Sequence, residues 1–133
     1  MKEEIQAAFE EMIDISTDID KAVMMDKDGV LASNMDEKAQ GDAVAKAREL
    51  VRLAEERATQ MGSQPFTQLV VDSASGYVFL AKDAGAEGAT LMATGKKGSR
   101  VGLVLYDLKT CLRDAFGGTQ AEAPKSRKKK GDS

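Results

Sequence analysis

One segment of the sequence carries oxygen ligands at the spacing of a calcium-binding loop. Four such side chains fall at positions 1, 3, 9 and 12 of that loop: Asp26, Asp28, Asn34 and Glu37. The loop needs glycine at its sixth position, but Leu31 stands there, and Val30 occupies a ligand position. We therefore interpret residues 26–29 as a hairpin turn rather than as a calcium site.

A second segment, Thr94–Ser99, combines glycine and lysine as phosphate-binding loops do. A P-loop needs a glycine five residues before its Gly-Lys pair, and that position is Thr90. A polar turn before a helix is the favoured interpretation. Weak binding of an anion at the helix N-terminus stays open as an alternative.

The residue types needed for most enzyme chemistry are scarce. The sequence has one cysteine and no histidine, so it lacks an intramolecular disulfide and the commonest acid–base catalyst and metal ligand. Cys111 lies near Leu108 and Leu112, where a packing role is favoured over a nucleophilic one. We predict that the protein is not an enzyme and uses no cofactor or metal.

The composition is that of one small globular domain with an aliphatic core. The chain has 133 residues, of which 42% are hydrophobic and only 5% aromatic, and no apolar run approaches a membrane span. The N-terminus is too acidic for a signal peptide, so we expect a cytoplasmic protein.

Charge is unevenly distributed along the chain. Residues 119–133 carry five basic and two acidic side chains, which leaves the preceding part clearly acidic because the whole chain has net charge −3. We predict a domain over residues 1–118 that does not bind nucleic acid, and a disordered basic tail over 119–133. The tail could contact acidic lipid, nucleic acid or protein weakly.

The first half of the chain predicts a helix, a hairpin and a long helix. Apolar residues at steps of three and four predict a helix over 3–17. Short apolar runs at 21–25 and 30–32 flank the turn as a hairpin. Asn34 and Glu37 resemble a capping box for a helix that ends at Met61 with Gly62 beyond it, and Gly41 could bend that helix or begin it.

The second half predicts three strands and a last helix. The strands are Phe66–Asp72, Tyr77–Lys82 and Ala89–Thr94, with a turn at 85–88 between the last two. A helix follows over 100–116, with Ser99 as its N-cap. The strands are apolar on both faces, and short links require antiparallel pairing, which predicts an antiparallel sheet covered on both sides.

This order of elements, α-β-β-α-β-β-β-α, resembles the roadblock family of dynein light chains and bacterial GTPase regulators. The hairpin Ala22–Ala32 and the junction from Gly88–Thr94 into Gly102–Leu108 carry the resemblance, which extends to about residue 117. It implies an α+β fold with a five-stranded sheet of order 2-1-5-4-3. The first and last helices lie on one face of that sheet and the middle helix on the other.

The resemblance also implies function. Family members dimerise through the middle helix and the third strand, which here includes Gln68 and Val70. They bind or regulate small Ras-like GTPases, or they act as adaptors in larger complexes. Both functions stay open at this point.

The middle helix is the best candidate for the interaction surface. Its apolar arc is broad, so it is either wholly buried or packed both on its sheet and on a partner. Five strands span about 24 Å whereas one helix covers about 10 Å, which favours a second copy of the chain. The predicted interface residues are Val44, Ala47, Arg48, Val51, Arg52, Glu55, Ala58, Gln68 and Val70.

Overall fold

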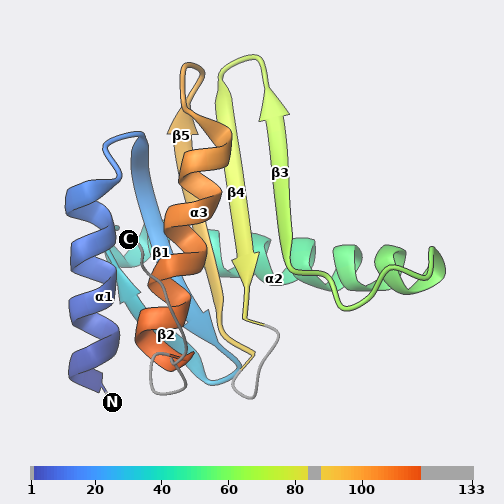
Figure 1. Cartoon of the computed structure of the whole chain (residues 1–133), viewed down its shortest axis with the longest axis horizontal. Coiled ribbons are helices and arrows are strands. Elements are labelled where there is room, and N and C mark those ends of the chain that lie inside the picture. Colours follow the sequence, from blue (N-terminus) through green and yellow to red (C-terminus); the bar gives the residue numbers. More distant parts are fainter. Residues whose placement is uncertain (1, 84–87, 118–133) are drawn as a thin grey trace, which may run out of the picture.

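The computed structural model describes residues 2–83 and 88–117. Its elements follow the predicted order (Figure 1): α1 (Lys2–Ile15), β1 (Ile19–Asp26), β2 (Gly29–Ser33), α2 (Glu37–Gln60), β3 (Gln68–Ser73), β4 (Gly76–Lys82), β5 (Thr90–Lys96), α3 (Val101–Leu112) and the single π-helical turn η1 (Arg113–Gly117).

The five strands form one antiparallel sheet of order β2-β1-β5-β4-β3. The predicted α+β fold and strand order are confirmed. β1 and β5 pair along most of their length at the centre, so β2 and β3 form the two edges.

The helices lie in two layers, one on each face of the sheet. Figure 1 shows α1 and α3 in front of the strands and α2 behind them, and we call these sides the front and the back. Side chains alternate between the two faces along each strand: Ala22 and Met24 of β1 belong to the front core, and Val23 and Met25 to the back core. Two buried faces explain why the strands are apolar without alternation.

The front core is closed by large side chains from both helices. Phe9 of α1 and Leu108 of α3 belong to the same buried cluster as Phe79 of β4, whose side chain is fully buried. η1 continues α3 and packs against α1 as well as α3. A single chain therefore closes the core beneath α1 and α3.

The back core is smaller and less completely covered. α2 runs across the back of the strands and continues beyond β3 (Figure 1). Ala47 is its only buried residue in the described chain, while neighbours such as Val44 and Val51 are half-buried. Much of α2 therefore faces solvent.

Two predicted helix caps are wrong, because the expected side chains bind elsewhere. Asp36, and not Asn34, caps α2 by accepting a hydrogen bond from the Ala39 N–H at 2.8 Å. Asn34 Oδ1 accepts the Ala22 N–H at 2.8 Å and so joins the end of β2 to β1. Ser99 Oγ donates to the Lys96 carbonyl, and Arg100 takes the N-cap position of α3.

Other boundaries differ by a few residues. α1 ends two residues earlier than predicted, and α2 runs unbroken through Gly41. Gly62 has φ 75°, which suits its predicted place after α2. Apart from Gly88, the predicted turn at 85–88 lies outside the described residues, as does the predicted tail at 119–133.

Candidate protein-interaction surface

The calcium-like segment forms the β1–β2 turn. Asp26 Oδ1 accepts the backbone N–H groups of Asp28 at 2.9 Å and Gly29 at 3.1 Å, which fixes the turn. Asn34 is engaged with β1. Residues 2–83 and 88–117 contain no group of three acidic or cysteine side chains placed to hold a metal ion.

The phosphate-like segment is the end of β5 and the turn into α3. A Cβ atom at Gly95 would meet Ser99 Oγ at 2.6 Å and the Phe79 ring at 3.2 Å, so packing requires this glycine. Lys97 Nζ binds Asp72 of β3 at 2.5 Å and lies 5.1 Å from the Tyr77 ring centre. The segment therefore joins α3 to the end of the β3–β4 hairpin.

Cys111 is buried between the front helices. Burial raises the pKa of its thiol to about 12, and the nearby carboxylates of Asp114 and Glu11 act in the same direction. The thiolate form needed for nucleophilic attack is therefore negligible at neutral pH.

An open depression of about 600 Å³ lies where the α1–β1 and β3–β4 connections meet. Asp18, one of two acidic residues that line it, accepts hydrogen bonds from Arg100 N at 2.8 Å and Arg100 Nε at 3.0 Å. These bonds lower the pKa of the Asp18 carboxyl below its ordinary value, so it is held ionised. The pairing ties the α1–β1 connection to α3.

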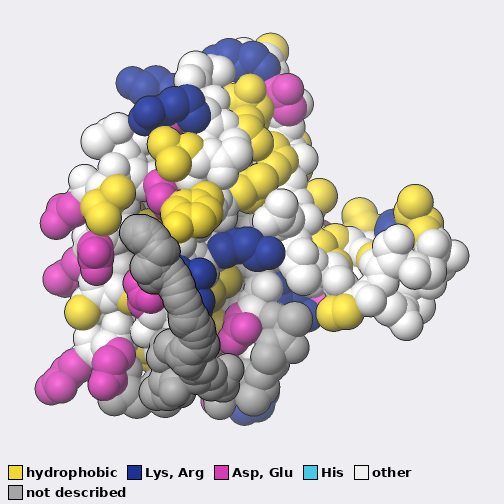
Figure 2. Space-filling view, in the orientation of Figure 1, with side chains coloured by type: hydrophobic (Ala, Val, Ile, Leu, Met, Phe, Trp, Pro, Cys, Tyr) yellow, Lys and Arg dark blue, Asp and Glu magenta, His cyan; other side chains and the backbone are white. Residues whose placement is uncertain are grey.

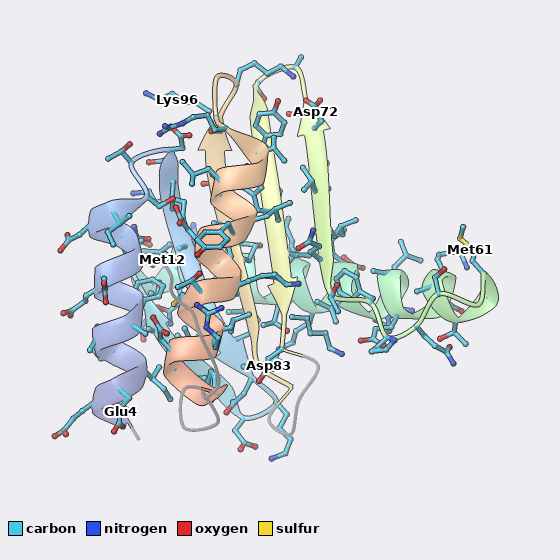
Figure 3. The ribbon with its side chains drawn as sticks, viewed as in Figure 1. Glu4, Met12, Met61, Asp72, Asp83 and Lys96 are labelled. Atoms are coloured by element: carbon cyan, nitrogen blue, oxygen red, sulfur yellow. The ribbon has the colours of Figure 1, made fainter. Side chains whose placement is uncertain are left out.

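The face of α2 that packs on the sheet combines four alanines with larger aliphatic side chains such as Val44, Leu50 and Val51. Ala47 is fully buried, and Ala43, Ala54 and Ala58 pack around the back core that includes Leu80 and Met92. Beyond β3 the helix has less sheet beneath it, and its last residues reach Met61, which Figure 3 places at the far end of α2.

Three of the predicted interface residues on α2 are charged, and we call Arg48, Arg52 and Glu55 the polar rim. Arg48 Nη2 donates to the Asp26 carbonyl at 2.9 Å, and Glu55 forms an ion pair with Lys82. Both rim residues therefore contact strand ends of their own chain. Arg52 is exposed and has no hydrogen-bonding or ionic partner in the described part of the chain.

The two predicted β3 residues face the front, on the opposite side of the sheet from α2. Gln68 pairs with Ala81 and Val70 with Phe79, and both of these β4 residues belong to the front core. Leu69 and Val71 pair with Leu80 and Val78 of the back core. On the back, β3 therefore presents Leu69 and Val71.

Sequence reasoning missed the most exposed apolar residues beside α2. Met61 is 77% exposed, Leu53 42% and Val71 40%. Leu53 lies about 200° around the helix from Glu55, on the flank turned away from Lys82. The sequence does hold one sign of this exposure, because Leu53 lies outside the main apolar stripe of the helix. We call these three residues, with Leu69, the α2–β3 surface.

The edge strand β3 adds unused backbone groups to this surface. β3 pairs with β4 alone, so its outer edge is unpaired within the described chain. Its sequence, QLVVDS, contains no proline and no lysine, two residue types that commonly prevent another strand from pairing with an exposed edge. Another β-strand can add here by backbone hydrogen bonding.

Comparison with known proteins gives a family match and several structural matches. The Roadblock/LC7 domain family model matches residues 9–93. No curated protein sequence matches the chain.

Three solved structures share the fold at low sequence identity. Myxococcus xanthus MglB has a TM-score of 0.74 at 13% identity, covering 95% of each chain. A Roadblock/LC7 domain from Streptomyces avermitilis has a TM-score of 0.73 at 17% identity, covering 84% of this chain and 94% of that one. The gliding protein mglB from Thermus thermophilus has a TM-score of 0.71 at 19% identity, covering 92% of each.

Proposed function

Because the chain belongs to the Roadblock/LC7 domain family, we propose that it is a non-catalytic homodimer that binds and regulates a small Ras-like GTPase. The observation that carries the proposal is the exposed α2–β3 surface beside an unpaired strand edge. The proposed location is the cytoplasm. None of the described helices is long and apolar enough to cross a membrane.

The α2–β3 surface supports homodimerisation. A second copy can add its own β3 to the open edge and its own α2 to the back layer. Leu53, Met61 and Val71 then lose contact with water, which is favourable at roughly 25 cal/mol per Å² of apolar area. One symmetric contact thus covers the apolar surface and gives hydrogen-bond partners to the unpaired backbone groups of β3.

A matched pair of substitutions tests the dimer. Leu53 on the back and Leu103 on α3 have nearly equal exposures, 42% and 43%. We expect Leu53→Glu to give a monomer by light scattering, whereas the unmodified chain and Leu103→Glu stay dimeric. A stable monomer of the unmodified chain at micromolar concentration contradicts the proposal.

Arg52 is the rim residue best placed to contact a GTPase. It is exposed without a partner among the described residues, and it lies near Arg48 and Glu55, which are held by their own chain. Two paired α2 helices would present two such arginines around a small apolar centre, the usual arrangement of an interface rim and core.

Regulation requires different affinities for the two nucleotide states. Nothing in the described residues forms a hydrolytic centre. The proposed dimer therefore acts by stabilising one arrangement of the GTPase switch segments, which is possible only if it binds the GTP and GDP forms unequally.

Calorimetry with small Ras-like GTPases of the source organism tests this mechanism. Each GTPase is loaded in turn with a non-hydrolysable GTP analogue or with GDP. We expect tighter binding of one state, and a loss of at least about tenfold in affinity for Arg52→Glu, equal to about 1.4 kcal/mol. The double variant Arg48→Glu/Arg52→Glu should lose more.

The control is Lys109→Glu, an equal charge change on α3 at the front. Its affinity for the GTPase should match that of the unmodified chain. Equal affinities for the two nucleotide states favour an adaptor that joins larger assemblies without sensing nucleotide. Undiminished binding by the double variant places the GTPase surface elsewhere.

A further inference from the structure

The front of the sheet has a margin that neither front helix covers. α1 packs against β2, and α3 packs mainly against β4. Figure 1 shows no helix in front of β3. Val70 of β3 and Tyr77 of β4 are only half-buried there, although both touch the front core.

Apolar side chains gather along this margin. Figure 2 shows them as a band between α3 and β3. Leu105 of α3 is half-buried beside the same core, and Tyr106 is 63% exposed on the outer surface of the helix. We call Val70, Tyr77, Leu105 and Tyr106 the front strip.

The charges of α3 and of η1, which continues it, are sorted between two flanks. Asp107 and Asp114 line a cavity of about 50 Å³ together with Glu11 of α1, so the acidic flank faces α1. Lys109 lies two residues from Asp107, about 200° around the helix, and one turn from Leu105. Arg113 follows one turn later, and both basic residues are exposed.

A basic group also stands at the other end of the strip. Lys97 Nζ lies 5.1 Å from the centre of the Tyr77 ring and binds Asp72. The apolar strip is therefore bordered by Lys109 of α3, by Arg113 at the start of η1 and by Lys97 at the β5–α3 turn.

We propose that the front strip binds an acidic amphipathic helix of a partner protein. A helix is about 10 Å wide, close to the width of two strands, and an i, i+3, i+4 stripe matches the narrow apolar band. Acidic residues on the flank of that helix meet Lys109 and Arg113. The strip lies across the sheet from the α2–β3 surface, so this binding goes beyond the proposed GTPase contact.

The charge of the strip selects among possible occupants. Residues 119–133 of the same chain carry five basic side chains and two acidic ones, so they have the same sign as the border of the strip. A second copy offers the acidic outer face of α1, but the apolar face of α1 is already buried. An acidic helix from a different protein satisfies both the apolar and the charge requirement.

Two fluorescent peptides test the proposal with the full chain. Both are designed amphipathic helices of about 14 residues, long enough to span about 21 Å. They share a leucine stripe and differ only in having glutamate or lysine on the flanks. By fluorescence anisotropy we expect the glutamate peptide to bind at least tenfold more tightly than the lysine peptide.

Variants locate the binding site. Lys109→Glu/Arg113→Glu should reverse the preference between the peptides, and Tyr106→Ser, at an exposed position, should weaken both. Leu53→Glu on the back should leave both affinities unchanged, even where it abolishes the dimer. These variants therefore distinguish a failure of the proposed helix binding at the front strip from a failure of the proposed GTPase function.

Four results overturn the proposal. They are no binding of the glutamate peptide, equal affinity for the two peptides, no effect of the double charge reversal, and loss of binding in Leu53→Glu with retention in Tyr106→Ser. The last result assigns the peptide to the α2–β3 surface.

Discussion

On the front of the sheet, α1 and α3 each bury four apolar side chains, including Phe9 and Leu108; on the back, α2 buries only Ala47. α2 is nevertheless the longest helix described, with 24 residues. The difference follows from the path of α2, which runs across the strands and continues beyond β3, so part of its length has no sheet beneath it (Figure 1). The core beneath α1 and α3 is closed within one chain, so the front leaves only the margin beside β3 uncovered, whereas much of the back has apolar area left for another molecule.

Breaking the front core should have the largest effect. Phe79→Ala removes a fully buried ring and should lower the free energy of unfolding by about 3–5 kcal/mol. Denaturant titration at low and high protein concentration checks this. The loss should be the same at both concentrations, and a loss confined to one of them would contradict a self-sufficient front.

Disrupting the back should have an effect that depends on concentration. Dimerisation stabilises the folded chain by about 2.7 kcal/mol when the protein concentration is about 100 times the dissociation constant. Leu53→Glu should lose that contribution at high concentration and little at low concentration. The same denaturant titrations measure it, with Leu103→Glu as the control, and a concentration-independent loss would speak against the dimer.

A smaller effect should separate the two arginines of the rim. Arg48→Ala removes the hydrogen bond to the Asp26 carbonyl and should cost about 0.5–1.5 kcal/mol. Arg52→Ala should change stability by less than about 0.5 kcal/mol, since surface positions without partners are tolerant. Equal losses in thermal unfolding would mean that Arg48 is no more engaged than Arg52.

The smallest expected effect is a pH dependence at the front. Hydrogen bonds from Arg100 lower the pKa of Asp18 in the folded chain, so the folded state favours the ionised carboxylate. The stabilisation is present above the ordinary pKa of 3.8 and is lost as the pH falls through the lowered value. The melting temperature of Asp18→Asn should therefore fall less steeply at acidic pH than that of the unmodified chain. Identical falls in the two proteins would contradict this.

The order of elements could be predicted because each one carries a local signal. The β1–β2 turn has Asp and Gly where a hairpin needs them, and Gly62 follows α2 in the left-handed region. The cap at Asn34 could not be predicted in the same way. The Asn34 side chain could accept a hydrogen bond either from a backbone N–H at the start of α2 or from the Ala22 N–H of β1. The bond to Ala22 forms, and it depends on tertiary packing that the local sequence does not reveal.

The interaction surface was harder to predict than the fold. Helical spacing groups Arg48, Arg52 and Glu55 on one flank, but it does not tell which flank crosses the strand ends. The consecutive apolar residues Leu69, Val70 and Val71 give no alternation that assigns β3 residues to a face. The flank of α2 is set by how the helix crosses the sheet, and the faces of β3 by its register with β4; both are properties of the packed structure.

The unpaired edge of β3 also bears on the life of a newly made chain before it meets a partner. Six residues of strand with exposed backbone groups form a template to which any extended segment can add. A chain that has not yet paired is thus exposed to aggregation and to chaperones and proteases that act on unassembled subunits. The edge that would join two copies therefore also makes the survival of a chain depend on how soon a second copy pairs with it.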